Sequence, residues 1–185
     1  MNLDALVEST CYTHSRQVSK ICSLLAEKAG YAPDEVAVIA QASLYHDIGK
    51  TDIPGHILNK PGALTPAEFE IVKKHTAHGY DRIMEAIGVL SVAADVCRDH
   101  HERPDGAGYG GRDGADVHPY TKLISTVDVF DALYSKRAYK EAWDIARIKA
   151  FFLEHSGTQF DADTVRLLLS SLGSVLPLYG ADSKQ

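Results

Sequence analysis

The sequence predicts an all-α fold. Apolar residues recur at intervals of three and four along most of the chain, strand-like alternation is absent, and glycine, proline and capping residues separate the periodic runs. The 185 residues, 45% hydrophobic and 24% charged, have the size and balance of one compact domain. We predict a single domain over residues 1–174 and a C-terminal tail over 175–185, with the polar end Gly180–Gln185 disordered.

Two helices are predicted in the first fifty residues. The first covers Thr13–Glu27, where apolar residues keep helical spacing until Gly30 supplies a stop. The second begins at Pro33, a residue that a first helical turn accepts, and its apolar run leads into the polar cluster His46–Lys50. This helix is therefore expected to end on side chains that can do chemistry.

A loop and two further helices follow. Thr51–Leu64 is rich in glycine and proline, which predicts a loop. Thr65-Pro66-Ala67-Glu68 has the pattern of a capping box with proline at the first helical position, so a third helix is expected to run to about Ala86. A shorter fourth helix over Leu90–Arg98 leads into His100-His101.

The second half begins with a loop and returns to helices. Pro104–Gly114 contains five glycines, which excludes a regular element. His118-Pro119 restarts a helical pattern, Glu141–His155 forms another, and Asp161 is expected to cap a last helix that ends near Gly173.

Charge and cysteine content narrow the function. The net charge of −6 supplies no basic surface for a nucleic-acid polymer or an anionic membrane, so a phosphate-bearing ligand must be held locally. Apolar runs fall far short of the ~20 residues of a membrane span, and the N-terminus lacks the basic region of a signal peptide. The three cysteines form no CxxC pair and are expected to be reduced. We therefore expect a soluble, cytoplasmic protein.

The strongest local signal is His46-Asp47-Ile48-Gly49-Lys50. Taken alone, an adjacent His-Asp pair at a helix end is equally well explained as a cap. Other polar residues sit at helix faces or ends that can converge with it, namely His14, His75, His100, His101 and Asp128. Asp128 lies between Val127 and Val129 on a core-facing helix, where a charge is costly unless it is paired or ligates a metal.

These residue types point to a metal site. Imidazole nitrogens and carboxylate oxygens suit borderline divalent ions, and seven such groups exceed what one ion requires from a protein. Two metal ions are the natural inference, with Asp47 able to bridge them. A water between two cations ~3.5–4 Å apart is acidified into a nucleophile suited to phosphoester hydrolysis.

The chain resembles the HD-GYP domains, a subgroup of the HD-domain metallophosphohydrolases. The matching segments are His14, His46–Lys50, Ile57–Gly62 leading to His75, His100–Tyr109, and Asp128–Leu133 followed by Arg137 and Lys140. The resemblance implies a bundle of about six to seven helices. It also implies hydrolysis of cyclic di-GMP, or a related cyclic dinucleotide, to the linear dinucleotide and on to GMP.

The resemblance also implies roles for these residues. One metal ion would take His14, His46, Asp47 and Asp128, and the other would take Asp47, His75, His100 and His101, with iron or manganese expected. Lys50 would contact the scissile phosphate, while Arg137 and Lys140 would hold the other phosphate. Tyr109 either stacks on a guanine or pins its loop. Asp131, Glu102 and Asp105 are expected to support the site and its loop.

Two positions depart from the family pattern. The glycine-tyrosine-proline signature reads Gly108-Tyr109-Gly110, so the loop lacks the proline that stiffens it in the family. This change bears on any contact that a protein partner makes through Gly106–Gly111. Members with three metals carry a glutamate four residues before the first histidine, and Thr10 stands there, which favours two metals.

Two other functions fit parts of the same pattern. The site could act on a linear nucleotide or a phosphomonoester, although Arg137 and Lys140 at a distance from Lys50 favour a ligand with two phosphates. Alternatively, the fold could serve as a catalytically silent binding module that signals through the glycine-rich loop. Retention of all seven expected ligands favours an enzyme.

Overall fold

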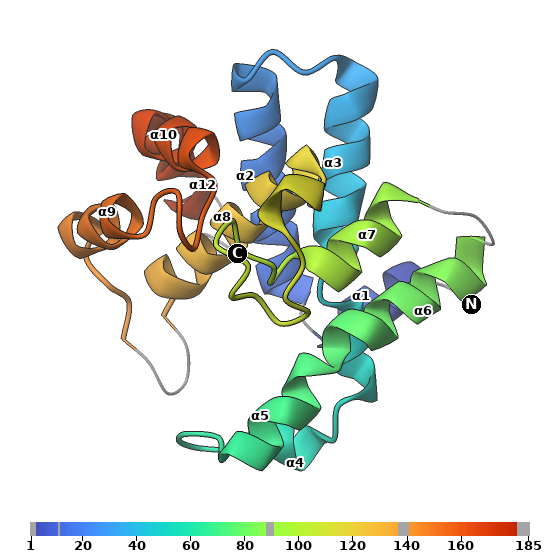
Figure 1. Ribbon diagram of the computed structural model, residues 1–185. Coiled ribbons are helices and arrows are strands. Elements are labelled where there is room, and N and C mark those ends of the chain that lie inside the picture. Colours follow the sequence, from blue (N-terminus) through green and yellow to red (C-terminus); the bar gives the residue numbers. More distant parts are fainter. Residues whose placement is uncertain (1–2, 11, 88–90, 137–140, 181–185) are drawn as a thin grey trace.

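The computed structural model describes residues 3–10, 12–87, 91–136 and 141–180, and helices dominate this part of the chain (Figure 1). No strand forms among these residues; Ser156 and Phe160 make only an isolated bridge. The all-α prediction is confirmed.

Five α-helices lie among the described residues up to Lys73. These are α1 (Leu3–Thr10), α2 (Tyr12–Lys28), α3 (Pro33–Tyr45), α4 (Gly55–Leu58) and α5 (Pro66–Lys73), with the 3₁₀ turn η1 (Ile48–Asp52) between α3 and α4. The segment predicted as a loop therefore holds the end of η1 and a single α-helical turn, which are too short to show helical periodicity. At α5, Thr65 and Glu68 form the predicted capping box.

The helix predicted from Thr65 to Ala86 is divided. It forms α5 and α6 (His75–Ile87), which meet at Lys74, where the N–H bonds back to Ile71 and Val72. The division brings His75 to the first position of α6.

The remaining helices form the other half of the bundle. They are α7 (Val92–Asp99), α8 (Pro119–Tyr134), α9 (Ile145–Glu154), α10 (Ala162–Ser170), α11 (Leu172–Val175) and α12 (Pro177–Gly180), with the 3₁₀ turn η2 (Gly114–Asp116). Asp161 caps α10 as predicted, whereas α9 begins at Ile145, after Asp144 rather than at Glu141, because the Asp144 carboxylate accepts the N–H of Arg147. Packed structure continues past the predicted boundary at 174, since Val175 is fully buried.

The buried apolar side chains form two clusters. The larger joins α2, α3 and α8 to α9 and α10 through residues such as Ile21, Phe130 and Phe152. The smaller joins α1, η1, α6 and the ends of α3 and α7 through Tyr45, Ile83 and other side chains. Because α3 and α7 contribute to both clusters, their C-terminal ends are held firmly. Those ends carry His46 and His100.

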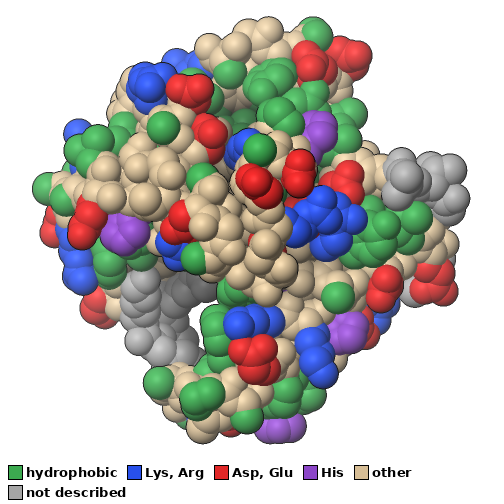
Figure 2. Space-filling view, viewed as in Figure 1, with side chains coloured by type: hydrophobic (Ala, Val, Ile, Leu, Met, Phe, Trp, Pro, Cys, Tyr) green, Lys and Arg blue, Asp and Glu red, His purple; other side chains and the backbone are tan. Residues whose placement is uncertain are grey.

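Mixed charge on the viewed face and buried thiols characterise the described part of the chain. Figure 2 shows basic and acidic side chains mixed over the viewed face. Within the described residues, no helix combines the length and apolar composition needed to cross a bilayer. Cys22 and Cys97 are buried free thiols, and burial raises the pKa of Cys22 to about 12, so both act as small core side chains.

Candidate metal centre

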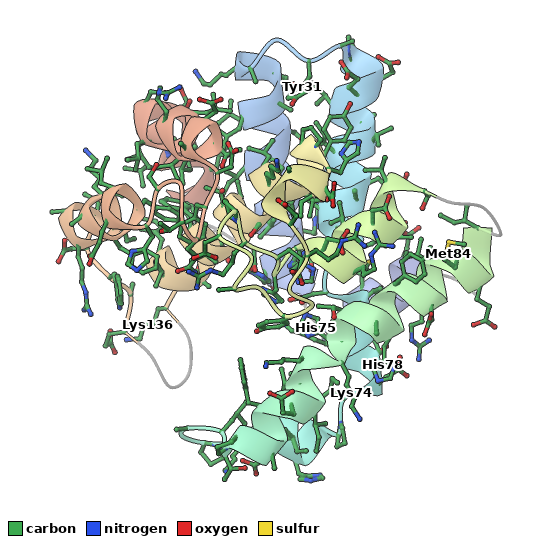
Figure 3. All side chains as sticks on the ribbon, viewed as in Figure 1. Tyr31, Lys74, His75, His78, Met84 and Lys136 are labelled. Carbon is green, nitrogen blue, oxygen red and sulfur yellow. The ribbon has the colours of Figure 1, made fainter. Side chains whose placement is uncertain are left out.

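Helix ends bring the predicted ligands together. His46 and His100 are the C-cap residues of α3 and α7, and His75 is the first residue of α6, on the side of that helix that faces the glycine-rich loop (Figure 3). His14 projects from α2 and Asp128 from α8. Asp47 links α3 to η1.

The donor atoms of these residues form two groups. The His14 group consists of His14, His46 and Asp128, and the His75 group consists of His75, His100 and His101. Within each group, one donor atom from each residue lies within 4.8 Å of the others. Apart from Asp47, the two groups contain the residues of the two ligand sets that the family resemblance implies.

Asp47 lies between the two groups. Its Oδ1 is 3.4 Å from His75 Nε2 and 3.7 Å from His100 Nε2. Its Oδ2 is 3.4 Å from His46 Nε2 and 4.0 Å from His14 Nε2. Each carboxylate oxygen therefore faces a different group.

Backbone carbonyls orient three of the imidazoles. His46 Nδ1 donates to the carbonyl of Ser43 and His75 Nδ1 to that of Val72, each over 2.7 Å. His100 Nδ1 lies 3.0 Å from the carbonyls of Val96 and Cys97. Because Nδ1 of each ring is bonded to a carbonyl, Nε2 is the ring atom that faces Asp47.

The arrangement fits divalent metal ions. His46 Nε2 and Asp47 Oδ1 are buried and make no hydrogen bond among the described residues. Polar atoms in that condition are costly in a folded protein unless another partner meets them. Nitrogen and carboxylate donors of this kind suit borderline divalent ions.

The two groups differ in charge. Burial would raise the pKa of Asp47, but Lys50 and His46 bring it well below the usual value for an aspartate. Burial would lower the pKa of His46, but Asp47 and Asp128 raise it to about 10. Burial and the neighbouring His100 lower the pKa of His75 to about 4. At neutral pH, without metal, His46 therefore carries a proton between carboxylates and His75 is neutral.

Of the four residues predicted to contact substrate, the structure describes Lys50 and Tyr109. Lys50 Nζ donates to Asp47 Oδ2, so a cation lies beside the carboxylate that joins the two groups. The Tyr109 ring lies 4.4 Å from that of His101 and 5.8 Å, edge-on, from that of Phe69. Arg137 and Lys140 lie outside the described residues.

Glu102 fixes the glycine-rich loop, as expected. Its buried carboxylate accepts hydrogen bonds from the backbone N–H groups of Gly110 and Arg112. A Cβ at Gly108 would lie 2.5 Å from Glu102 Cα, so only glycine fits there. Proline at position 110 would remove the N–H that Glu102 binds, which explains how this loop is held without the family's proline.

Sequence reasoning did not identify two contacts of the site. Phe69 packs against Tyr109, and its only sequence signal was an apolar residue on a short polar helix. Tyr179 Oη donates to Asp131 Oδ1, and Asp131 in turn accepts from His14 Nδ1. No local pattern marked Tyr179, which lies 48 residues after its partner.

Comparison with known proteins places this geometry in a family. The profile of the HD domain family matches residues 1–163. The chain belongs to the HD domain family. The resemblance inferred from the sequence is therefore confirmed.

Curated relatives of this HD domain are cyclic-dinucleotide enzymes. It is 37% identical over 158 residues to a 3′3′-cGAMP-specific phosphodiesterase of Vibrio cholerae, covering 84% of this chain and 30% of the relative. It is 37% identical over 155 residues to the cyclic di-GMP phosphodiesterase response regulator RpfG of Xanthomonas campestris, covering 83% and 41%. The HD domain thus spans less than half the length of these relatives.

Solved structures support the fold of this HD domain. An HDG"Y"P protein from Bdellovibrio bacteriovorus aligns with a TM-score of 0.71 and 21% identity, covering 86% of this chain and 51% of that one. The HD domain of the phosphodiesterase PgpH from L. monocytogenes, in complex with cyclic-di-AMP, aligns with a TM-score of 0.62 and 20% identity, covering 94% and 92%.

Proposed function

We propose that this HD domain is a metal-dependent phosphodiesterase that hydrolyses cyclic di-GMP, or a related cyclic dinucleotide, first to the linear dinucleotide and then to GMP. The observation that carries the proposal is the pair of donor groups on either side of Asp47, with Lys50 beside that carboxylate. The relatives named as cyclic di-GMP and 3′3′-cGAMP phosphodiesterases support the substrate class.

Two divalent ions per chain, iron or manganese, are part of the proposal. The His14 group with Asp47 would hold one ion and the His75 group with Asp47 the other. Bound there, the ions would supply an activated water and neutralise the charge that develops on the phosphate. A third ion would need another anionic ligand, and the family position for it is the neutral Thr10.

The side chains of this HD domain would hold and orient the substrate. The Lys50 ammonium, which faces Asp47, is placed to attract a phosphate toward the ligands and to stabilise the leaving oxygen. Tyr109, lying over His101, offers a ring on which a purine can stack next to the ligands. Arg137 and Lys140 remain the predicted contacts of the second phosphate.

The proposed partners follow from the same features. The substrate is the partner at the metal centre, and a protein partner at the Gly106–Gly111 loop is a second proposal from the family resemblance. We propose a cytoplasmic protein that binds neither a nucleic-acid polymer nor a membrane, on the basis of its net charge of −6.

Elemental analysis combined with a time-resolved hydrolysis assay tests this function. We expect two ions per chain and accumulation of the linear dinucleotide before GMP. His46→Ala should lose the ion of the His14 group and abolish turnover, whereas His78→Ala, which replaces a histidine outside both groups, should leave both unchanged. Metal without turnover would show a silent binding module, and turnover of linear substrates alone would show a different nucleotide hydrolase.

A further inference from the structure

A chain of hydrogen bonds runs from α12 to His14, a member of the His14 group. Tyr179 Oη donates to Asp131 Oδ1 over 2.8 Å. Asp131 Oδ2 accepts from His14 Nδ1 over 2.6 Å, and His14 Nε2 lies 2.9 Å from Asp128 Oδ1. Side chains from α12, α8 and α2 are thereby joined in one line that ends at the His14 group.

The imidazole of His14 is oriented by a different kind of partner from those of His46, His75 and His100. His46, His75 and His100 are oriented by carbonyls of their own helices or turns, within four residues. His14 lies inside α2, where the carbonyls are used by the helix, so its Nδ1 is oriented by a carboxylate from another helix. The orientation of His14 therefore depends on how Asp131 itself is held.

Asp131 is buried and fully engaged. Its Oδ1 accepts from Tyr179 Oη and, over 3.0 Å, from Ser135 Oγ, which leaves Oδ2 for His14. Two donors on one oxygen fix the rotation of the carboxylate about its Cβ–Cγ bond. Of these donors, Ser135 lies one turn further along the chain, whereas Tyr179 reaches Asp131 from α12.

Tyr179 is itself held by packing. Its ring lies 4.6 Å from that of Tyr134 and 6.3 Å from that of Phe130, and α12 also packs against α2, the helix that carries His14. Burial and the nearby Asp131 raise the pKa of Tyr179 above its usual value, so the phenol keeps its proton and remains a donor.

We propose that Tyr179 is a positioning residue for the metal centre: through Asp131 it fixes the His14 imidazole, and so makes metal affinity of the His14 group dependent on the packing of the C-terminal helix. This inference rests on the proposed metal site and adds a residue to it. Outer partners of metal ligands orient the ligand ring and raise its basicity.

Cobalt(II) binding to the full 185-residue chain tests the proposal. Metal-free protein is titrated with Co²⁺, with bound ions counted by equilibrium dialysis and the histidine-bound ions followed by visible absorption. Tyr179→Phe keeps the ring and removes the hydroxyl. It should raise the dissociation constant of one of the two Co²⁺ ions by about 2- to 10-fold, the effect of one hydrogen bond. Asp131→Asn should weaken the same ion by about 10- to 100-fold.

Tyr134→Phe is the matched control. It removes a hydroxyl from the same aromatic cluster without touching the bonds to Asp131, so Co²⁺ affinity should not change. The effect of Tyr179→Phe should persist in a His101→Ala background and vanish in a His14→Ala background. Thermal unfolding of each metal-free variant shows whether the fold is retained.

Three results would overturn the proposal. Unchanged or tighter Co²⁺ binding by Tyr179→Phe would show that the hydroxyl does not position the ligand. Equal weakening of both ions, or the same weakening by Tyr134→Phe, would reduce Tyr179 to a packing role. Failure of the proposed metal site is seen separately, because the unmodified chain would then bind no Co²⁺, and failure of the proposed activity is seen in the hydrolysis assay.

Discussion

Asp47 lies between the His14 and His75 groups and turns one oxygen toward each. We expect Asp47→Asn to lower metal content and to reduce hydrolysis by more than about 100-fold, because a neutral amide offsets the repulsion between two cations poorly. His46→Ala and Asp128→Ala should resemble each other, since both belong to the His14 group. Ions per chain and initial rates are the measurements.

Asp52→Asn is the control for this prediction. Asp52 ends η1 and forms an ion pair with Arg82 away from both groups, so the same chemical change there should leave metal content unaltered. A rate above about a tenth of the unmodified value in Asp47→Asn would remove Asp47 from its bridging role.

The pKa values of the histidines predict that the two groups respond differently to pH. The pKa of His46 is raised to about 10, so below that pH an ion entering the His14 group must displace its proton, and affinity there falls as pH falls. The pKa of His75 is lowered to about 4, so His75 is already neutral above that pH and its group binds without losing this proton. Between about pH 9 and pH 6, the affinity of the His14 group should fall about tenfold per pH unit for each displaced proton, whereas His75 should add no such loss at its own group.

Calorimetry in buffers of different ionisation heat counts the protons released. Burial would lower the pKa of His14, but its hydrogen bonds to Asp128 and Asp131 raise it, so this group holds a second imidazole with a raised pKa besides His46. At pH 7 we therefore expect at least one proton per ion from a His101→Ala protein, in which the His14 group is intact, and fewer from a His14→Ala protein. Equal proton release from the two variants would contradict the assignment of the protonated imidazoles to the His14 group.

At the scale of elements, the contact between η1 and α6 depends on Gly49. A Cβ at Gly49 would lie 2.0 Å from the carbonyl oxygen of His75 and 2.4 Å from the nitrogen of Gly79. Gly49→Ala must therefore separate η1 from α6 and move Asp47 away from His75. We expect a loss of about 1–3 kcal/mol in stability, as for other overpacked sites, together with loss of metal affinity.

Denaturant unfolding and Co²⁺ titration check this prediction. Gly173→Ala is a suitable control, because no atom lies within 4 Å of the added Cβ in that α11 position. It should leave metal binding unchanged and should not destabilise the fold. A Gly49→Ala protein as stable as the unmodified chain would show that the close approach of the two elements is not required.

For the whole molecule, the larger apolar cluster predicts a fold that survives metal removal. Its side chains come mainly from α2, α8, α9 and α10, and their burial does not involve the donor groups. Chelation should therefore preserve helical circular dichroism. It should still lower the unfolding temperature, because ions that bind only the native state stabilise it by about 2.7 kcal/mol at 100 times Kd.

Circular dichroism during thermal unfolding measures both effects. Restoring Mn²⁺ or Co²⁺ should raise the unfolding temperature again, while Mg²⁺ should do so much less, because it prefers oxygen ligands over imidazole. Loss of helical signal on chelation would show instead that the ions are needed for folding.

Signals confined to a few residues were sufficient for much of this fold. Thr65 with Glu68, and Asp161, marked helix starts because a cap acts within one turn. The helical periodicity of α2, α3 and α8 followed from the face that each turns to the core. The candidate ligands were visible as histidines and aspartates at helix ends or on helix faces, and the family resemblance indicated that they form one metal site.

The sequence by itself thus determined the all-α class, the main helices and the candidate ligands, because capping, periodicity and side-chain chemistry are local properties. Only the tertiary structure decided that α5 and α6 meet at Lys74, which oxygen of Asp47 faces which group, and that Tyr179 holds Asp131. These features depend on the packing of helices that are distant in the chain. The sequence around either residue of such a contact does not indicate which distant residue it will meet.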